Sequence, residues 1–243
     1  MIKVRGLKKD FDNKKVLKGV DIDILDNETM VILGPSGQGK TVMIKSMIRL
    51  IEPDKGEIHF DDYNITKLNK GELENFRKHI AYVFQNSALF DFLDVRENLA
   101  LFLKMHKKMS SEEIEDRIEK ALSFVGLEKD VLGKFPEELS GGMKKRVAIA
   151  RAMIKEPKYI FYDEPTTGLD KKNAELVSNL IEVLKDKISA TSIIVTHDIE
   201  LMNKVSDRVA LLRDGKIFFI GKKEEISADT LEYLYSIGDT YEI

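Results

Sequence analysis

The segment that most constrains the fold is residues 34–41, Gly-Pro-Ser-Gly-Gln-Gly-Lys-Thr, which follows the apolar run 30–33 and precedes the helix-like run 42–48. Its spacing fits G-x-x-x-x-G-K-[ST], in which glycines let consecutive backbone N–H groups curl around a diphosphate. In this pattern Lys40 reaches the β and γ oxygens and the Thr41 hydroxyl ligates Mg²⁺, while the following helix adds its positive dipole end. The sequence therefore predicts a strand, a phosphate-binding loop and a helix. The residues expected to hold nucleotide here are Gly34, Pro35, Ser36, Gly37, Gln38, Gly39, Lys40, Thr41 and Val42.

Length and composition are those of a globular protein with a sizeable core: 243 residues, 43% hydrophobic and 33% charged. Because no long apolar window occurs, we expect neither a membrane span nor a signal peptide, and a cytosolic protein. The chain has no cysteine, which excludes disulfides and thiolate metal sites. Its formal charge of -3 gives no general attraction to nucleic acid, so no nucleic-acid partner is expected.

The first 25 residues are predicted to form a hairpin in an antiparallel sheet. Short strand-like runs at 2–4 and 20–24 flank a polar turn at 12–15. Phe11 lies just before that turn, where its ring could stack on a purine base. Simple packing is an alternative role for this side chain.

After Gln85 the pattern changes from short strands to helical periods. Residues 110–113 have the spacing of a capping box, and the apolar residues that follow share one helix face. Strand-like sequence resumes at Tyr159. We therefore expect a helical insert at 86–156 within a strand–helix core.

Two further strands are expected to end in polar side chains. The apolar run 159–162 is followed by Asp163 and Glu164, and the run 192–195 is followed closely by His197. Carboxylates at the C-terminal end of a strand lie where open α/β sheets bind ligands. These residues are therefore candidates for the same site as the phosphate-binding loop.

A second candidate for anion binding is the triplet Ser140, Gly141 and Gly142, at the predicted start of a helix. A helix N-terminus with two glycines suits a γ-phosphate. Lys144 and Lys145 follow in the first turns, and we expect them on a solvated basic face.

Several ordered motifs together resemble the ATP-binding subunit of an ATP-binding-cassette (ABC) transporter, over residues 1–222. The motifs, in order, are the loop at 34–41, Gln85 after a strand, Leu139-Ser140-Gly141-Gly142-Met143, the strand ending in Asp163-Glu164, Gly168-Leu169-Asp170 and Thr196-His197-Asp198.

The resemblance implies an α/β fold. Its P-loop NTPase (RecA-like) core would carry an N-terminal antiparallel β subdomain and a helical signature subdomain. Residues 1–85 and 157–222 would form the nucleotide-binding core, 86–156 the signature subdomain, and 223–243 a C-terminal helix and tail.

The resemblance also implies roles for individual residues, with ATP and Mg²⁺ as cofactors. Glu164 would polarise the attacking water, which suits a reaction that needs positioning and charge neutralisation. His197 would contact the γ-phosphate, and Gln85 would lie near the metal and the water. Asp163 would hold Mg²⁺ through water. The implied metal set is Thr41, Gln85 and Asp163, and the implied nucleotide set adds Phe11, Val16, Ser140, Gly141 and Gly142 to the loop.

In the family that this chain resembles, two subunits sandwich two nucleotides, so the γ-phosphate at Ser140 would belong to ATP on the opposite subunit. A homodimer on membrane permease subunits is therefore implied, peripheral on the inner face of the cytoplasmic membrane. Met143 departs from the usual Gln of such cassettes, and Met cannot donate a hydrogen bond.

The motifs around Gln85, Met143 and Glu164 look most like those of Mla-type phospholipid transporters, whose permease joins a lipid-binding MCE protein. The tail after Ile226 resembles that group too, and there Tyr233, Leu234 and Tyr235 would either contact a partner or pack locally. Amino-acid or methionine importers and lipoprotein exporters share every catalytic motif. A soluble scaffold cassette, as in iron–sulfur assembly, is the alternative from another class.

Overall fold

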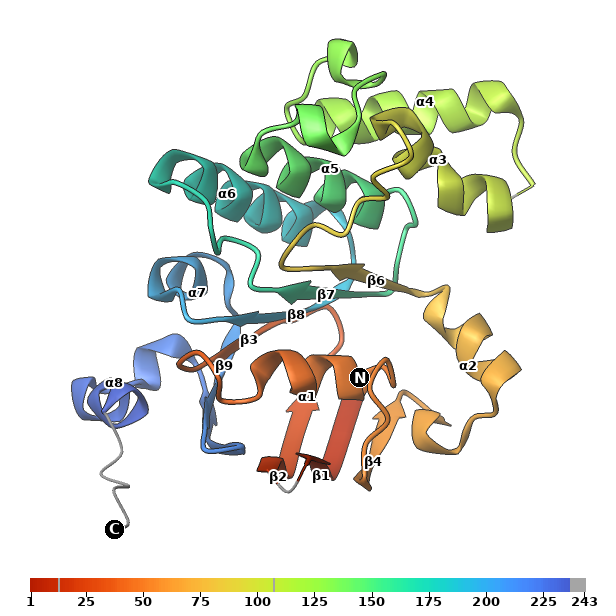
Figure 1. Cartoon of the computed structure of the whole chain (residues 1–243). Helices are drawn as coiled ribbons and strands as arrows, with labels where there is room; N and C mark the ends of the chain where they lie inside the picture. Colours follow the sequence, from red (N-terminus) through yellow and green to blue (C-terminus); the bar gives the residue numbers. More distant parts are fainter. Residues whose placement is uncertain (13, 107, 237–243) are drawn as a thin grey trace. The chain divides into compact units, whose positions relative to one another are not determined.

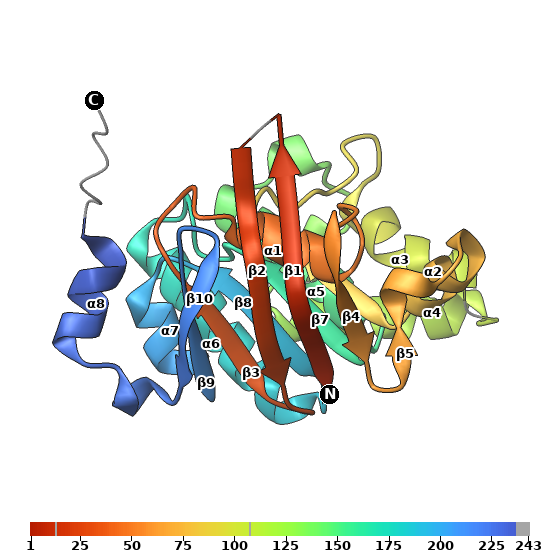
Figure 2. The ribbon, with the colours of Figure 1, turned by 90° about the horizontal axis from the view of Figure 1, so that it is seen from below.

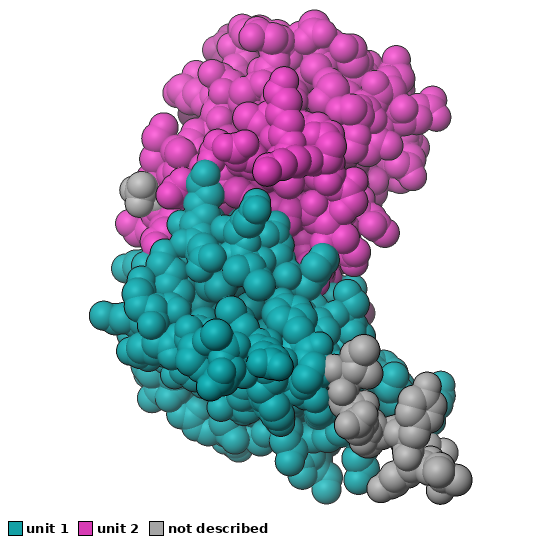
Figure 3. Space-filling view, turned by 90° about the vertical axis from the view of Figure 1, so that its left-hand side faces the viewer, with its two compact units in different colours: residues 1–68, 195–243 teal, residues 69–194 magenta. Residues whose placement is uncertain are grey.

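The computed structural model describes residues 1–12, 14–106 and 108–236. The chain forms two compact units, which Figure 3 colours separately. Unit 1 contains residues 1–68 and 195–243, and unit 2 contains residues 69–194. These limits differ from the predicted core and helical insert, and that predicted division stays a prediction. Figure 1 gives the order of the elements.

Unit 1 contains the predicted antiparallel sheet, with strand order β2-β1-β4-β5. The long strands β1 and β2 lie side by side as a hairpin (Figure 2). Alternate residues of β1, such as Ile2 and Val4, are buried, which is the period-2 pattern of a sheet with one covered face. The strands are β1 (Ile2–Phe11), β2 (Lys14–Ile24), β4 (Lys55–Phe60) and β5 (Tyr63–Asn64).

Unit 1 also contains the strand that leads into the phosphate-binding loop. Strand β3 (Thr29–Leu33) pairs in parallel with β9 (Arg208–Arg213), which pairs antiparallel with β10 (Lys216–Gly221). All of β3 is buried, as expected of a strand covered on both faces. The helices of unit 1 are α1 (Lys40–Met47), α7 (Ile199–Val205) and α8 (Ala228–Tyr235), with short 3-10 turns at Ile65–Lys67 and Lys223–Glu225.

Helix α8 packs within unit 1. Leu234 is buried, and the Arg213 guanidinium lies 4.3 Å from the centroid of the Tyr233 ring. The Tyr235 hydroxyl donates to the backbone oxygen of His197 at 3.2 Å. Of the two readings of this helix, the structure thus supports local packing. The rest of the predicted tail, 237–243, lies outside the described residues.

Unit 2 contains strands in the order β8-β7-β6, and β6 and β7 are parallel. The chain passes from unit 2 to unit 1 within β8. The strands are β6 (Ile80–Val83), β7 (Tyr159–Asp163) and β8 (Thr191–Thr196), and the helices are α2 (Lys70–Arg77), α3 (Val95–His106), α4 (Ser111–Phe124), α5 (Gly141–Met153) and α6 (Lys171–Lys187), with 3-10 turns at Lys129–Val131 and Pro136–Glu138.

The helices α3, α4 and α5 pack against one another, as Figure 1 shows. Helix α4 begins with the predicted capping box: the Ser110 hydroxyl accepts from the Glu113 amide at 3.2 Å, and the Glu113 carboxylate accepts from the Ser110 amide at 2.6 Å. Its buried face includes Ile114 and Ile118. Among the described residues, no helix is long and apolar enough to cross a bilayer.

Gly56 sits opposite a bulge in β1 and should be hard to replace. The register between β1 and β4 shifts between Arg5 and Lys8. Gly56 has a φ of 107°, and a Cβ there would lie 2.7 Å from the backbone oxygen of Arg5.

We predict that Gly56→Ala lowers the free energy of unfolding by about 2 kcal/mol or more, because both the backbone conformation and the space forbid a side chain. Urea denaturation measures this. Gly133→Ala is the matched control, because a Cβ at Gly133 meets nothing within 4 Å. Equal stabilities for the two variants would contradict the argument.

Candidate active site

The phosphate-binding loop of unit 1 is closed by its own lysine. Lys40 is 5% exposed, and its Nζ donates to the backbone oxygens of Gly34 at 2.7 Å and Pro35 at 2.9 Å. Gly39 precedes α1 with a φ of 94°, and a Cβ there would be 3.0 Å from a methyl carbon of Val16. The loop therefore holds a cation at a helix N-terminus, which is the arrangement that binds phosphate.

Two neighbouring segments of unit 1 contact this loop. The Gly34 amide donates to the Thr196 backbone oxygen at 3.3 Å, so the end of β8 adjoins the loop, and exposed His197 follows. The Gln38 side chain accepts from the Asp214 amide at 2.6 Å, which fixes the β9–β10 turn on the loop.

Phe11 and Val16 flank the turn of the β1–β2 hairpin. Phe11 is 42% exposed at the end of β1, and the Lys9 ammonium lies 5.2 Å from its ring centroid. Val16 is half-buried, in reach of Gly39. An exposed aromatic ring is available for stacking on a base, and the assignment of both residues to the nucleotide site stays a prediction.

The acid pair of unit 2 lies at the end of buried β7. Asp163 is 2% exposed, and its Oδ2 accepts from the Tyr82 hydroxyl at 2.9 Å. Burial and the charge of Asp163 both raise the pKa of Tyr82, so this phenol stays a donor. Glu164 is 7% exposed, and its Oε2 accepts from the Thr167 hydroxyl at 3.0 Å.

Glu164 also has an unusual backbone conformation, with a φ of 48°. The left-handed region costs a non-glycine residue on the order of 1–3 kcal/mol and persists only where the surroundings enforce it. Such residues cluster at functional sites. The carboxylate that the motif order identified therefore also stands out by its geometry.

The burial of Lys145 shows that one prediction was wrong. It was expected on a solvated face, but it is 2% exposed, and its Nζ donates to the backbone oxygens of Gln85 at 2.6 Å and Phe84 at 3.4 Å. Burial lowers the pKa of Lys145 to about 8, while the charges of Asp163 and Glu164 act in the opposite direction. Lys145 is buried because α5 packs on β6.

The helical spacing of the buried residues in α5 indicates that Lys145 is buried. Gly142, Lys145, Ala148, Ile149 and Ala152 are all buried and follow the i, i+3, i+7 spacing of one helix face. The sequence shows the apolar residues of that face, but the charge of Lys145 favours a place on the solvent-exposed side of the helix. Lys144, one position away, is half-exposed.

The N-terminus of α5 is accessible in unit 2. Ser140 and Gly141 are exposed, and the Ser140 hydroxyl accepts from the Met143 amide at 3.3 Å. Gly142 is buried. The predicted triplet is therefore a capped helix N-terminus of a 13-residue helix, and its role in anion binding stays a prediction.

The predicted metal ligands have the right chemistry for Mg²⁺. The Thr41 hydroxyl, the Gln85 amide oxygen and the Asp163 carboxylate are hard oxygen donors, and Mg²⁺ is usually held by one or two carboxylates plus substrate phosphates. Throughout the described ranges, no three acidic, His or Cys side chains converge into a metal cluster. Thr41 belongs to unit 1 and the other two to unit 2, so this set stays a prediction.

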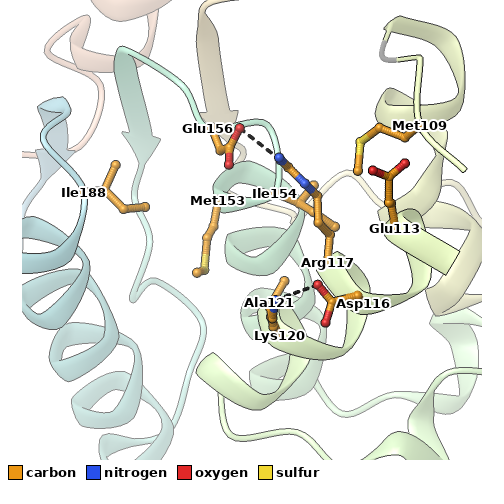
Figure 4. Close-up of a pocket in the computed structure, with 10 residues that line it drawn as sticks. All are labelled: Met109, Glu113, Asp116, Arg117, Lys120, Ala121, Met153, Ile154, Glu156 and Ile188. Atoms are coloured by element: carbon orange, nitrogen blue, oxygen red, sulfur yellow. Dashed lines mark hydrogen bonds and ion pairs between the residues drawn. The ribbon is translucent and has the colours of Figure 1, made fainter.

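A pocket elsewhere in unit 2 is not the candidate site. It has a volume of about 530 Å³ and lies between α4 and the end of α5 (Figure 4). Arg117 pairs with Glu156 at 2.9 Å, and Lys120 pairs with Asp116 at 2.6 Å. None of the predicted site residues lines it.

Comparison with known proteins identifies the family. Residues 17–167, from the β2 strand to just beyond Glu164, match the ABC transporter family. The chain belongs to this family.

Curated relatives differ in what their names say they carry. The Mycobacterium leprae protein named "Probable ribonucleotide transport ATP-binding protein mkl" is 38% identical over 92% of this chain. The chain spans 64% of that relative's length. The chloroplastic protein Trigalactosyldiacylglycerol 3 of Arabidopsis thaliana is 38% identical, covering 95% of this chain and 71% of the relative. The lipoprotein-releasing system ATP-binding protein LolD of Bacteroides fragilis is 39% identical, covering 89% of this chain and all of the relative.

A solved structure confirms the predicted fold class. A dimeric ATP-binding cassette in a post-hydrolysis state, bound to ADP and Pi, has a TM-score of 0.84 and 34% identity, covering 91% of this chain and 98% of that one. The fold is thus that of a P-loop NTPase cassette with an antiparallel N-terminal sheet.

Proposed function

We propose that this chain is the MgATP-hydrolysing subunit of an ABC transporter, working as a homodimer on membrane permease subunits, at the inner face of the cytoplasmic membrane. Family membership and the Lys40-closed loop support nucleotide binding. The buried, strained Glu164 at the end of β7 is the observation that carries hydrolysis, because a carboxylate that is fixed in position can polarise the water that attacks a phosphate.

The proposed chemistry follows from the geometry of each unit. Lys40 and the N-terminus of α1 hold the phosphates, and exposed His197 contacts the γ-phosphate. Glu164, held by Thr167, orients the attacking water and accepts a proton from it as the water oxygen bonds to the γ-phosphorus and the bond from that phosphorus to the ADP oxygen breaks. When bound, Mg²⁺ would neutralise phosphate charge, held by Thr41, Gln85 and Asp163.

Glu164→Gln is predicted to abolish ATP turnover and preserve ATP binding, because the amide keeps the shape and removes the charge that polarises water. We expect turnover to fall by about 100-fold or more. Phosphate release and equilibrium nucleotide binding are measured on the same preparation. Lys40→Ala should instead weaken binding itself. Turnover by Glu164→Gln at the wild-type rate would exclude Glu164 as the catalytic base.

The proposed dimer places the N-terminus of α5 against the ATP of the partner subunit. The dimeric state of the solved cassette and the exposure of Ser140 and Gly141 support this arrangement. Two exposed helix N-termini would each meet the negative charge of a γ-phosphate. The short loop before α5 would then lie in the interface.

ATP is predicted to dimerise the Glu164→Gln variant, in which hydrolysis cannot dissolve the interface. Adding Ser140→Arg should leave a monomer at the same ATP concentration, because of steric and charge conflict. Light scattering measures the mass. Ser110→Arg is the matched control, since Ser110 is also an exposed helix-capping serine but lies on α4. A Ser140→Arg protein that still dimerises with ATP would contradict the model.

We further propose a phospholipid as the cargo, moved by an Mla-type system that includes an MCE lipid-binding protein. The motifs around Gln85, Met143 and Glu164 support this reading. The name of the Arabidopsis relative, which is that of a glycerolipid, adds to it. Lipoprotein release, as named for the Bacteroides relative, and import of amino acids or methionine are the alternatives.

Reconstitution tests the cargo. The chain is placed with its permease in vesicles that contain labelled phospholipid. We expect ATP-dependent lipid movement, and none with the Glu164→Gln variant as the control. ATP hydrolysis that is stimulated by a soluble solute and its binding protein, without lipid movement, would overturn the lipid proposal.

A further inference from the structure

The turn that follows β6 in unit 2 has a costly backbone conformation. Ser87 has a φ of 61° and Ala88 a φ of 45°, both in the left-handed region. This conformation is unfavourable for a non-glycine residue and persists only where neighbouring groups hold it. Gln85 is exposed at the start of this turn, so what holds the turn also determines where the Gln85 side chain lies.

Helix α5 supplies two cations that hold this turn by its backbone. The Lys145 ammonium donates to the Gln85 oxygen at 2.6 Å, and the Arg151 guanidinium donates to the Ser87 oxygen at 2.9 Å. Hydrogen bonds from charged donors are about twice as strong as neutral ones. The turn is therefore fastened to the same helix whose N-terminus carries Ser140.

Lys145 is the more informative of the two cations. Burying an ammonium is costly unless hydrogen bonds and opposite charges compensate. Here the compensation comes from two backbone oxygens of the turn and from the charges of Asp163 and Glu164. A neutral side chain at this position of α5 would avoid the cost but could not donate charged hydrogen bonds to the turn.

We propose that Lys145 is a positioning residue for Gln85: its ammonium fixes the Gln85 peptide to the first turns of α5, so that the Gln85 side chain and the α5 N-terminus move as one body. The consequence for catalysis rests on the proposed ATPase function. The fixation itself does not.

The first test measures the fixation without nucleotide. Lys145→Met removes the ammonium and keeps the length, and Lys144→Met makes the same change at the half-exposed neighbour. Amide hydrogen exchange in residues 85–88 should become about tenfold faster in Lys145→Met and stay unchanged in Lys144→Met. Unchanged exchange in Lys145→Met would overturn the proposal. If Lys145→Met does not fold, Lys145→Gln undergoes the same measurement with the same expectation.

The second test asks whether Lys145 acts through Gln85. Lys145→Met should lower kcat about tenfold with KM for ATP within about twofold, and should add less than about twofold in a Gln85→Ala background. A full additional loss in that background would mean that Lys145 acts elsewhere, for example on Glu164, and would overturn the proposal. A wild-type protein that hydrolyses no ATP would refute the proposed function, whereas the exchange experiment would still decide the role of Lys145.

Discussion

The bond from the Lys40 ammonium to the loop's own carbonyl oxygens is the interaction on which the candidate site depends. It gives the loop a defined shape before any phosphate binds, so a nucleotide replaces two backbone acceptors instead of ordering a free side chain. Residues around the loop help to maintain that shape. The positive φ of Gly39 and the close approach of Val16 disfavour a side chain at position 39, and Gln38 holds the turn at Asp214.

In unit 2, two carboxylates are buried at the end of one strand, so the cost of burying their charge must be compensated. Asp163 has a phenolic donor in Tyr82, Glu164 has a hydroxyl donor in Thr167, and Lys145 contributes positive charge. Hydrogen bonds of this kind compensate the cost of burying a charged group.

Much of this organisation was predictable from local sequence. The spacing of the motif residues alone places the phosphate-binding loop between β3 and α1, and the capping box at Ser110 determines where α4 begins. The burial of Lys145 departs from the prediction because a charged side chain usually indicates contact with solvent, whereas its apolar helix neighbours at i+3 and i+4 indicate the buried face. The left-handed backbone of Glu164 and Ser87 has no sequence signature, since neither is glycine. The fold does not specify the cargo either, because relatives named for ribonucleotide and for lipoprotein transport are 38% and 39% identical to this chain.

The bond from Tyr235 to the backbone of His197 has a consequence for the energy landscape of the chain. A neutral hydrogen bond of this kind contributes about 1 kcal/mol, which corresponds to roughly a fivefold change in population. Rotation of the His197 peptide therefore requires α8 to release it, but at a cost that thermal motion meets easily. The position of α8 therefore acts as a weak bias on that peptide: it favours the orientation that the structure shows without locking it.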